Sequence, residues 1–226
     1  PMSDSLFLLL VCGFFLLLLD DRALPAGVCG FLAAFCRSPG ALLTGAAGAL
    51  YLSALLCRKD RFRPRWLLPV LGPAAGIGAY LALNLAVYGD PFRFSFYQAS
   101  HWSQRLGWFW NTIVYHGQSF LGWLADSPGT AFWLSLWAVG TLVIGLAAFV
   151  PGRPLPAWMQ LYGLAYYAFT NGVTWLLSAP RYALNDPMIP LGLACLPRGA
   201  RRVVWVVLAV GWTAFFAAFL RGLPIY

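Results

Sequence analysis

Charged side chains are scarce in this sequence, and none of them is glutamate. Charged residues make up 10% of the 226 positions, and all seven acidic residues are aspartates. Soluble domains carry roughly 25% charged residues, so this deficit excludes an ordinary soluble globule. The hydrophobic content of 61% favours helices that cross a membrane. Apolar runs such as residues 6–19 lack the period-two alternation of membrane β-strands.

Several kinds of site chemistry also lack their usual residues. The five cysteines lie in or at the ends of apolar runs without metal-ligand spacing, so we predict no zinc site. No Gly-rich loop with a lysine follows the phosphate-binding pattern, so nucleotide hydrolysis is not supported. A divalent cation such as Mg²⁺ or Mn²⁺ would need paired carboxylates, for which Asp4, Asp90 and Asp186 are the candidates. We predict no other cofactor.

What is present is a series of apolar segments separated by short connectors. The series predicts an all-α, polytopic transmembrane helical bundle, with residues 1–226 as a single integral membrane domain. Small residues in the third segment favour close helix packing, whereas prolines and glycines in the fourth favour kinks. The eight expected spans are residues 5–19, 23–35, 41–56, 66–87, 130–150, 157–177, 187–196 and 203–220.

The basic residues cluster in connectors. If residues 58–65 are cytoplasmic, the alternation of spans places residues 20–22, 151–154 and 197–202 on that side too, with ten of the fifteen Lys and Arg residues. This positive-inside pattern means that the net charge of +8 sets orientation and does not indicate nucleic acid. The expected location is the plasma membrane of a bacterium, or the endoplasmic reticulum membrane of a eukaryote, with the bilayer as a partner; the sequence does not predict an oligomeric state.

The opposite, non-cytoplasmic face receives a long aromatic loop at residues 88–128, which we expect to lie at the membrane surface. Within this extracytoplasmic loop we expect an amphipathic interfacial helix. On such a helix Gln98, His101 and Arg105 share one face, opposite Trp102. The same side of the membrane also receives Asp4, Arg37, Arg181 and Asp186.

Four sequence elements together resemble the PIG-V-type mannosyltransferases, the GPI mannosyltransferase II family and its bacterial relatives. Their order and spacing agree over nearly the whole chain, although each element alone is weakly specific. The elements are residues 3–10 (SDSLFLLL), residues 32–40 (LAAFCRSPG), residues 88–94 (YGDPFRF) with Gln98 and Trp102, and the pair Arg181-Tyr182.

The resemblance implies a membrane glycosyltransferase of the GT-C class. Such an enzyme transfers a hexose, here mannose, from a polyprenyl- or dolichyl-phosphate donor to an acceptor on the non-cytoplasmic face. In this family the acidic catalytic candidate lies in a loop after the first transmembrane helix, often as Trp-Asp. This sequence has no Trp-Asp and opens on Pro1. We therefore expect it to be the C-terminal part of the enzyme, without that catalytic loop.

Sugar transfer from a phosphate needs a base for the acceptor hydroxyl and cations for the leaving phosphate. Asp90 and Asp4 are the catalytic candidates. Arg37 and Arg181 lie at span ends and suit phosphate, because a guanidinium binds phosphate oxygens bidentately. The remaining candidates for substrate or phosphate binding are Tyr182, His101, Gln98, Trp102 and Arg105.

Each candidate also has a purely structural explanation. Arg37 and Arg181 would snorkel or pair with a neighbouring aspartate. Asp90 would cap the turn of its loop, and Asp4 would be a helix N-cap. His101 would lie on a polar face towards water.

Two other functions stay open. A transporter or flippase of lipid-linked substrates usually carries ionisable groups near the bilayer midplane. The span centres here are almost free of charge, with Asn84, Thr170 and Asn171 as their most polar residues. The second alternative is a noncatalytic membrane subunit or a truncated remnant.

Overall fold

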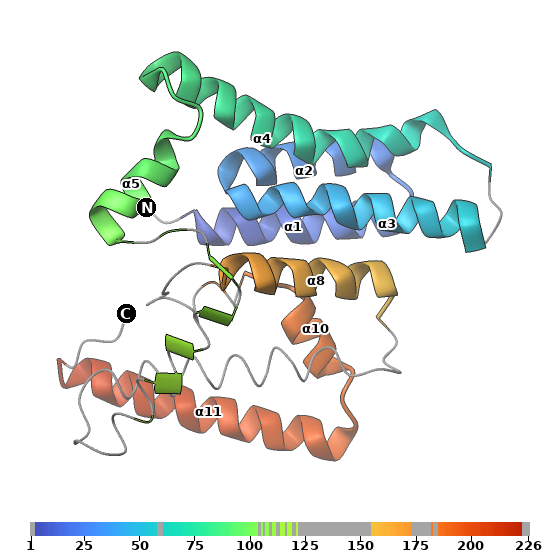
Figure 1. The fold of residues 1–226 in the computed structure, drawn as a ribbon. Helices are drawn as coiled ribbons and strands as arrows, with labels where there is room; N and C mark the ends of the chain where they lie inside the picture. Colours follow the sequence, from blue (N-terminus) through green and yellow to red (C-terminus); the bar gives the residue numbers. More distant parts are fainter. Residues whose placement is uncertain are drawn as a thin grey trace. The chain divides into compact units, whose positions relative to one another are not determined.

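The computed structural model describes residues 3–57, 61–103, 155–172 and 185–222, with scattered positions between 105 and 121 and Tyr182. In these residues the backbone forms helices and no strand, as predicted. The chain divides into two compact units (Figure 1). The first comprises Pro1–Arg105, Pro156–Phe169 and Asn185–Pro187, and the second comprises Leu106–Leu155, Thr170–Leu184 and Met188–Tyr226. The predicted span at residues 130–150 lies outside the described residues.

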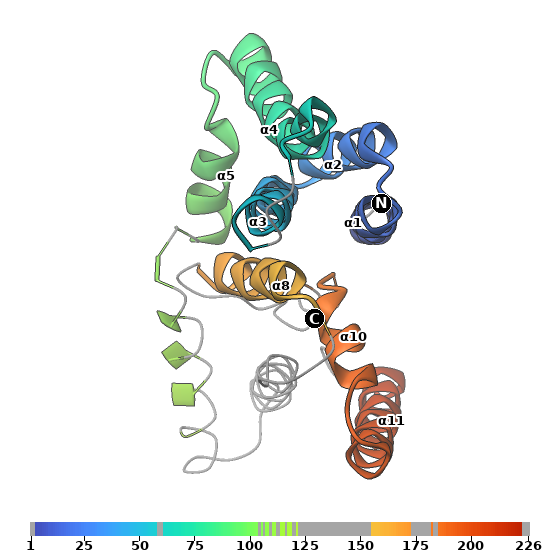
Figure 2. The same cartoon turned by 90° about the vertical axis from the view of Figure 1, so that its right-hand side faces the viewer.

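Four long helices form the frame of the first unit. They are α1 (Asp4–Leu19), α2 (Ala23–Cys36), α3 (Leu42–Cys57) and α4 (Leu67–Tyr88), preceded at α3 and α4 by the short 3₁₀ helices η1 (Ser38–Ala41) and η2 (Pro64–Trp66). Helix α2 packs against both α1 and α4, and α3 packs against α4, which Figures 1 and 2 show from two sides. The first four predicted spans are confirmed as helices, with ends that differ by at most one residue.

Two of these helical segments are long and apolar enough to cross a membrane. They are Ser38–Cys57, of 20 residues, and Pro64–Tyr88, of 25 residues. At 1.5 Å per residue, the 20-residue segment spans about 30 Å, the thickness of a bilayer core. Helices α1 and α2 are apolar but shorter, with 16 and 14 residues. The structure therefore supports a helical protein with two candidate spans and leaves the eight-span bundle a prediction.

The helices of the first unit are apolar on their outer faces as well as on their inner ones. Leu9 is 68% exposed and Leu56 is 70% exposed. Helices that are hydrophobic all round are typical of a large protein core or of a membrane. The buried core is built mainly from Phe7, Val11, Phe14, Phe15, Ala26, Ala33, Ala34, Leu43, Ala47, Tyr162 and Tyr166.

Glycines bring the backbones of α2 and α4 into direct contact. A Cβ atom at Gly72 would meet the carbonyl oxygen of Gly27, and one at Gly76 would meet the carbonyl oxygen of Phe31. Both helices advance by four residues between these contacts, so they run in the same direction. Small residues allow this approach in membrane helices. Helix α4 continues through Pro73, and of its glycines Gly72 and Gly76 make the contact with α2.

The close packing predicted for the third span is not made by its glycines. A Cβ atom at Gly45 or Gly48 would meet nothing within 4 Å. The buried small residues of α3 are instead its alanines, among them Ala46 and Ala47.

The loop at residues 88–128 contains a helix, as predicted, in α5 (Arg93–Trp102); its position at the membrane surface stays a prediction. Gly89 ends α4 in the left-handed conformation at φ 69°, which glycine adopts without strain. Helix α5 ends when Ser103 takes φ 49°, also left-handed. Arg105 therefore follows the helix and does not share a helical face with Gln98 and His101. The prediction that Arg105 lies on this helical face is wrong, because the helix ends at Trp102.

Helix α8 (Ala157–Thr170) completes the first unit with aromatic contacts to α1. The ring centroids of Phe15 lie 5.6 Å from Trp158 and 5.0 Å from Tyr162. The helix ends seven residues before the predicted end of this span at residue 177, and residues 173–180 lie outside the described part of the chain.

The second unit contains α10 (Met188–Ala194) and α11 (Arg198–Leu220). Helix α11 begins five residues before the predicted span, so three arginines that we assigned to a connector lie in its first turns. Arg201 Nη1 donates a hydrogen bond of 3.0 Å to the Ala194 carbonyl at the end of α10. A cation at a helix C-terminus stabilises the carbonyls left without partners there. This contact ties the start of α11 to the end of α10.

Candidate functional site

The candidate site lies where α1 begins and α2 ends. Asp4 is the first residue of α1, and Arg37 follows the last residue of α2. Because the two helices are antiparallel neighbours, these ends coincide, and Arg37 Nη1 donates to Asp4 Oδ1 in an ion pair. The Asp4 side chain is 17% exposed and the Arg37 side chain 14%. The structure thus brings together two of the predicted site residues.

The chain returns to this pair from a distant part of the sequence. Asn185 Nδ2 donates to Asp4 Oδ1 at 2.7 Å, across 181 positions. Asn185 and the adjacent Asp186 are both buried. Asp4 is therefore held by an arginine and an amide. We name these four residues, Asp4, Arg37, Asn185 and Asp186, the polar cluster.

Aromatic rings form the apolar wall beside the polar cluster. The Arg37 guanidinium carbon lies 5.9 Å from the centroid of the Phe7 ring, within the range of a cation–π contact. Phe7 stacks in turn on Tyr166, with centroids 6.1 Å apart. Tyr162 is buried on the same helix as Tyr166, and its hydroxyl makes no hydrogen bond within the described residues.

This arrangement includes one of the structural explanations for Arg37, because the arginine does pair with an aspartate. The corresponding explanation for Asp4 is wrong. The N-cap of α1 is Ser3, and Asp4 lies inside the first turn, where a carboxylate complements the helix dipole.

A second ion-pair group occupies the other end of the same helices. Asp21 Oδ2 accepts from Arg65 and lies 3.7 Å from Arg63 Nη1. The Asp21 side chain is 55% exposed, against 17% for Asp4. The contact places Asp21 beside Arg63 and Arg65 at one end of the unit, in agreement with the predicted alternation of spans. This exposed group contains the same residue types as the mostly buried Asp4–Arg37 pair and can be compared with it.

One face of α5 carries two more of the predicted residues. Gln98 and His101, with Phe94 and Tyr97, line an open hollow of about 590 Å³. Ser100 Oγ lies 2.9 Å from His101 Nδ1. The guanidinium carbon of Arg93 lies over two neighbouring rings, 4.6 Å from the centroid of Phe96 and 5.1 Å from that of Tyr97. Aromatic and hydrogen-bonding side chains on one face suit a polar ligand with an apolar ring face.

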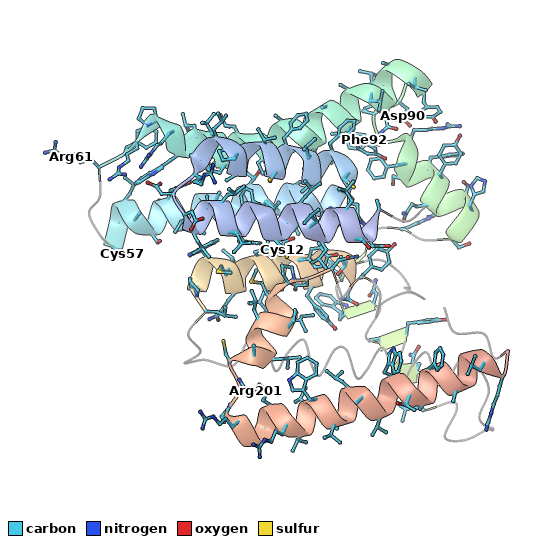
Figure 3. All side chains as sticks on the ribbon, turned by 180° about the vertical axis from the view of Figure 1, so that it is seen from behind. Cys12, Cys57, Arg61, Asp90, Phe92 and Arg201 are labelled. Carbon is cyan, nitrogen blue, oxygen red and sulfur yellow. The ribbon has the colours of Figure 1, made fainter. Side chains whose placement is uncertain are left out.

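Asp90 makes the turn contact that we weighed as its structural explanation. Its Oδ1 accepts from the Phe92 backbone N–H at 2.9 Å. This bond fixes the sharp turn between α4 and α5. Figure 3 shows Asp90 and Phe92 at this end of α4 and Arg61 and Cys57 at the opposite end of the unit.

The remaining predicted residues lie in other parts of the chain. Trp102 is the last residue of α5, and Arg105 is exposed beyond it. Tyr182 is half-buried and belongs to the second unit, while Arg181 lies outside the described residues. Among the described residues no group of three or more His, Cys, Asp and Glu side chains could hold a metal ion.

Reasoning from the sequence missed Asn185 as a site residue. Asp186 belongs to the expected outer acidic set, but an isolated asparagine beside it carries no pattern that predicts a contact with residue 4. The polar residue of α4, Asn84, is satisfied locally, because its Nδ2 donates to the Tyr80 carbonyl at 3.1 Å.

Comparisons of the chain with protein-family models, with curated proteins and with solved structures find no match. The resemblance to the PIG-V-type family stays a prediction that depends on the four sequence elements alone.

Proposed function

We propose that this chain belongs to a membrane glycosyltransferase that transfers a hexose, mannose by its resemblance, from a polyprenyl-phosphate donor at the non-cytoplasmic face. The observation that carries the proposal is the mostly buried Asp4–Arg37 pair at the end of apolar helices. A charge at this depth is costly unless it is paired or serves a polar ligand. A lipid-borne phosphate reaches such a depth by itself, because its tail stays in the bilayer.

Arg37 has the role of phosphate ligand in this proposal. During transfer the bond between the anomeric carbon and the phosphate oxygen breaks, and a bond to the acceptor oxygen forms. The phosphate leaves with added negative charge, which a guanidinium stabilises through its planar fork. Asp4 orients Arg37 and, as the base, takes the proton that the acceptor hydroxyl loses when its oxygen bonds to the anomeric carbon. We assign Asp90 to the turn, because its carboxylate caps the Phe92 N–H.

The donor-binding test uses the full chain in nanodiscs with polyprenyl-phosphate mannose as the probe. We expect Arg37→Lys, which keeps the charge but loses the fork, to weaken binding roughly tenfold. Asp4→Asn is expected to weaken it as well, since Arg37 loses its orientation. Asp90→Asn keeps an oxygen for the Phe92 N–H and should leave binding unchanged.

The matched control for this test is the exposed pair at the other end of the helices. Arg65→Lys and Asp21→Asn make the same two substitutions in a pair whose side chains are 46% and 55% exposed to solvent. Equal losses from Arg37→Lys and Arg65→Lys would remove Arg37 from the donor site. Failure of the unsubstituted chain to bind the donor, while it stays folded by circular dichroism, would reject the proposed function.

A further inference from the structure

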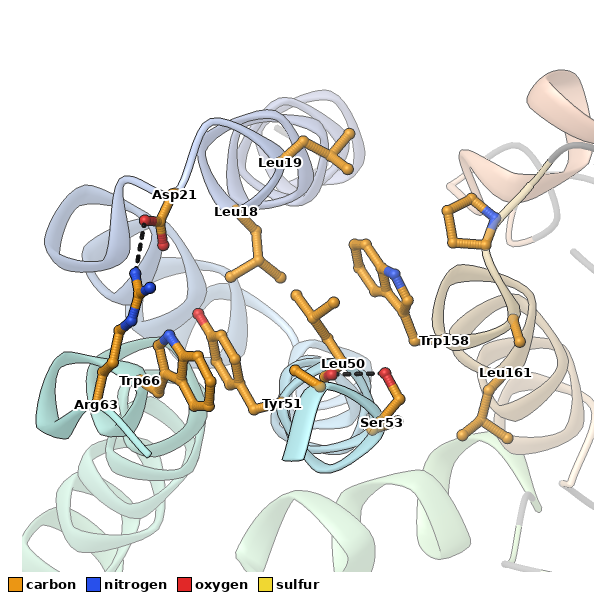
Figure 4. A pocket seen from close by; sticks show the side chains of 14 residues that line it. Leu18, Leu19, Asp21, Leu50, Tyr51, Ser53, Arg63, Trp66, Trp158 and Leu161 are labelled. Carbon is orange, nitrogen blue, oxygen red and sulfur yellow. Dashed lines mark hydrogen bonds and ion pairs between the residues drawn. The ribbon is translucent and has the colours of Figure 1, made fainter. Parts of the chain in front are cut away.

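A cavity of about 700 Å³ opens at the end of the first unit that carries Asp21, away from the polar cluster (Figure 4). Its walls come from the ends of α1 and α3, the start of α8 and the connector before α4. Sites for small molecules usually measure about 300–1,000 Å³, so the volume suits one ligand headgroup with part of an attached chain.

The charged part of the cavity wall is one aspartate and one arginine, with a second arginine beside them. Asp21 and Arg63 line the cavity, and Arg65, which is not part of the lining, pairs with the same Asp21 carboxylate. Two guanidinium groups therefore share one carboxylate, and the three side chains are each about half exposed. Exposed ion pairs are weak, so an anion can compete for these arginines at little cost.

The other wall is apolar and aromatic. Leu18, Leu50 and Leu161 line it together with Trp158, which is almost fully buried. Tyr51 stacks on Trp66 with centroids 4.8 Å apart, and both rings border the cavity. Trp and Tyr rings at this position are typical of the level of lipid headgroups. A small soluble anion has no apolar part that could contact this wall.

The cavity also lies where the two candidate spans meet. Ser38–Cys57 ends and Pro64–Tyr88 begins at this end of the unit, and residues 58–63 between them contain four basic residues and one aspartate, with Arg65 at the start of the second span. Basic clusters beside a membrane span attract anionic lipids.

We propose that this cavity binds one anionic phospholipid, with its phosphate on Arg63 and Arg65 and the upper part of an acyl chain on the leucine and tryptophan wall. The proposal requires that the chain lies in a membrane. It does not depend on sugar transfer, which we place at the opposite end of the helices.

The test measures lipid binding to the full chain in neutral detergent by native mass spectrometry and by thermal melting. The probes are phosphatidylglycerol, phosphatidylcholine and water-soluble glycerophosphate. We expect one phosphatidylglycerol to bind saturably and to raise the melting temperature. Arg63→Gln with Arg65→Gln should weaken this binding at least about tenfold.

A matched double variant separates the cavity from general attraction. Arg198→Gln with Arg202→Gln removes the same charge from exposed residues at the start of α11 and should leave the affinity unchanged. Asp21→Asn should tighten binding several-fold, because it releases both arginines. Asparagine also tolerates the left-handed backbone of residue 21, at φ 57°.

Three results would overturn the proposal. Equal losses from the two double variants would mean surface attraction without a site. Binding of phosphatidylcholine as tight as that of phosphatidylglycerol would mean that the arginines do not select the headgroup. Binding of glycerophosphate as tight as that of the lipid would mean that a free phosphate, and not a lipid, is the ligand.

Discussion

The two ion-pair groups of the first unit contain the same residue types in opposite surroundings. Asp4 and Arg37 are each less than one-fifth exposed, and Asn185 donates a further hydrogen bond to Asp4. Asp21 and Arg65 are about half exposed. Removing one partner of a buried pair leaves an uncompensated charge, whereas an exposed charge is solvated and screened. We therefore expect the stability of the first unit to depend on Asp4 and Arg37 more than on Asp21 and Arg65.

This difference predicts unequal effects on stability. We expect Arg37→Met to lower the free energy of unfolding by about 1–3 kcal/mol, below the ~3–5 kcal/mol cost at fully buried pairs because some solvent remains. Arg65→Met should lower it by at most about 1 kcal/mol. Denaturation in one detergent, followed by circular dichroism, gives both values. Similar losses for the two variants would contradict the buried character of the Asp4–Arg37 pair.

The sequence predicts the meeting of Asp4 and Arg37 in part. Two consecutive apolar helices joined by a short connector must be antiparallel, so the start of one lies beside the end of the next. No comparable rule reaches Asn185, because its contact depends on the path of the chain across more than 180 positions. Whether Arg181 joins the site is a prediction that the described residues do not test.

The interface between α2 and α4 depends on the glycines of both helices. A methyl group at residue 72 or 76 would collide with a carbonyl oxygen of α2, which is backbone and cannot rotate away. At Gly78, on the same helix, a methyl group would meet nothing within 4 Å. Two of the three glycines of α4 therefore have no room for a side chain, whereas the third has room for one.

Alanine substitutions at these positions should change the stability of the protein in opposite directions. Gly72→Ala and Gly76→Ala are expected to destabilise the protein by about 1–3 kcal/mol, the usual cost of overpacking. Gly78→Ala should be neutral or stabilise by up to about 1 kcal/mol, because alanine favours the helix. Thermal melting of the three variants in one detergent measures the difference. A loss at residue 78 equal to that at 76 would show that the contact with α2 does not decide the result.

Helices were easier to predict than the places where they end. The apolar runs of α1 to α4 identify these helices, since only apolar side chains suit their faces. Arg105 was misplaced because the left-handed Ser103 stops α5, and a single serine gives no warning of that conformation. The early start of α11 was missed because its first turns contain three arginines, which we took as a sign of a connector. One of them, Arg201, donates a hydrogen bond to the end of α10.

The molecule as a whole is predicted to have a basic cytoplasmic side and a mixed non-cytoplasmic side. The two ion-pair groups of the first unit agree with this division, since Asp21 meets the basic connector at one end and Asp4 meets Arg37 at the other. The contacts give the two ends but not which of them faces the cytoplasm. The positive-inside rule supplies that assignment.

Cysteine labelling tests the sidedness directly. In a variant without the five native cysteines, Ser100→Cys and Arg61→Cys are introduced one at a time at exposed positions. A membrane-impermeant maleimide added to right-side-out vesicles should label residue 100 at once and residue 61 only after permeabilisation. Labelling of both from outside would contradict the predicted topology, and reversed labelling would place the polar cluster in the cytoplasm.

The backbone contact between α2 and α4 also closes one side of α2 to any lipid chain. Where two peptide backbones touch, no hydrocarbon tail fits between them. Under the proposed function, the isoprenoid tail of a donor bound to Arg37 is therefore expected to lie along a side of α2 that α4 does not cover.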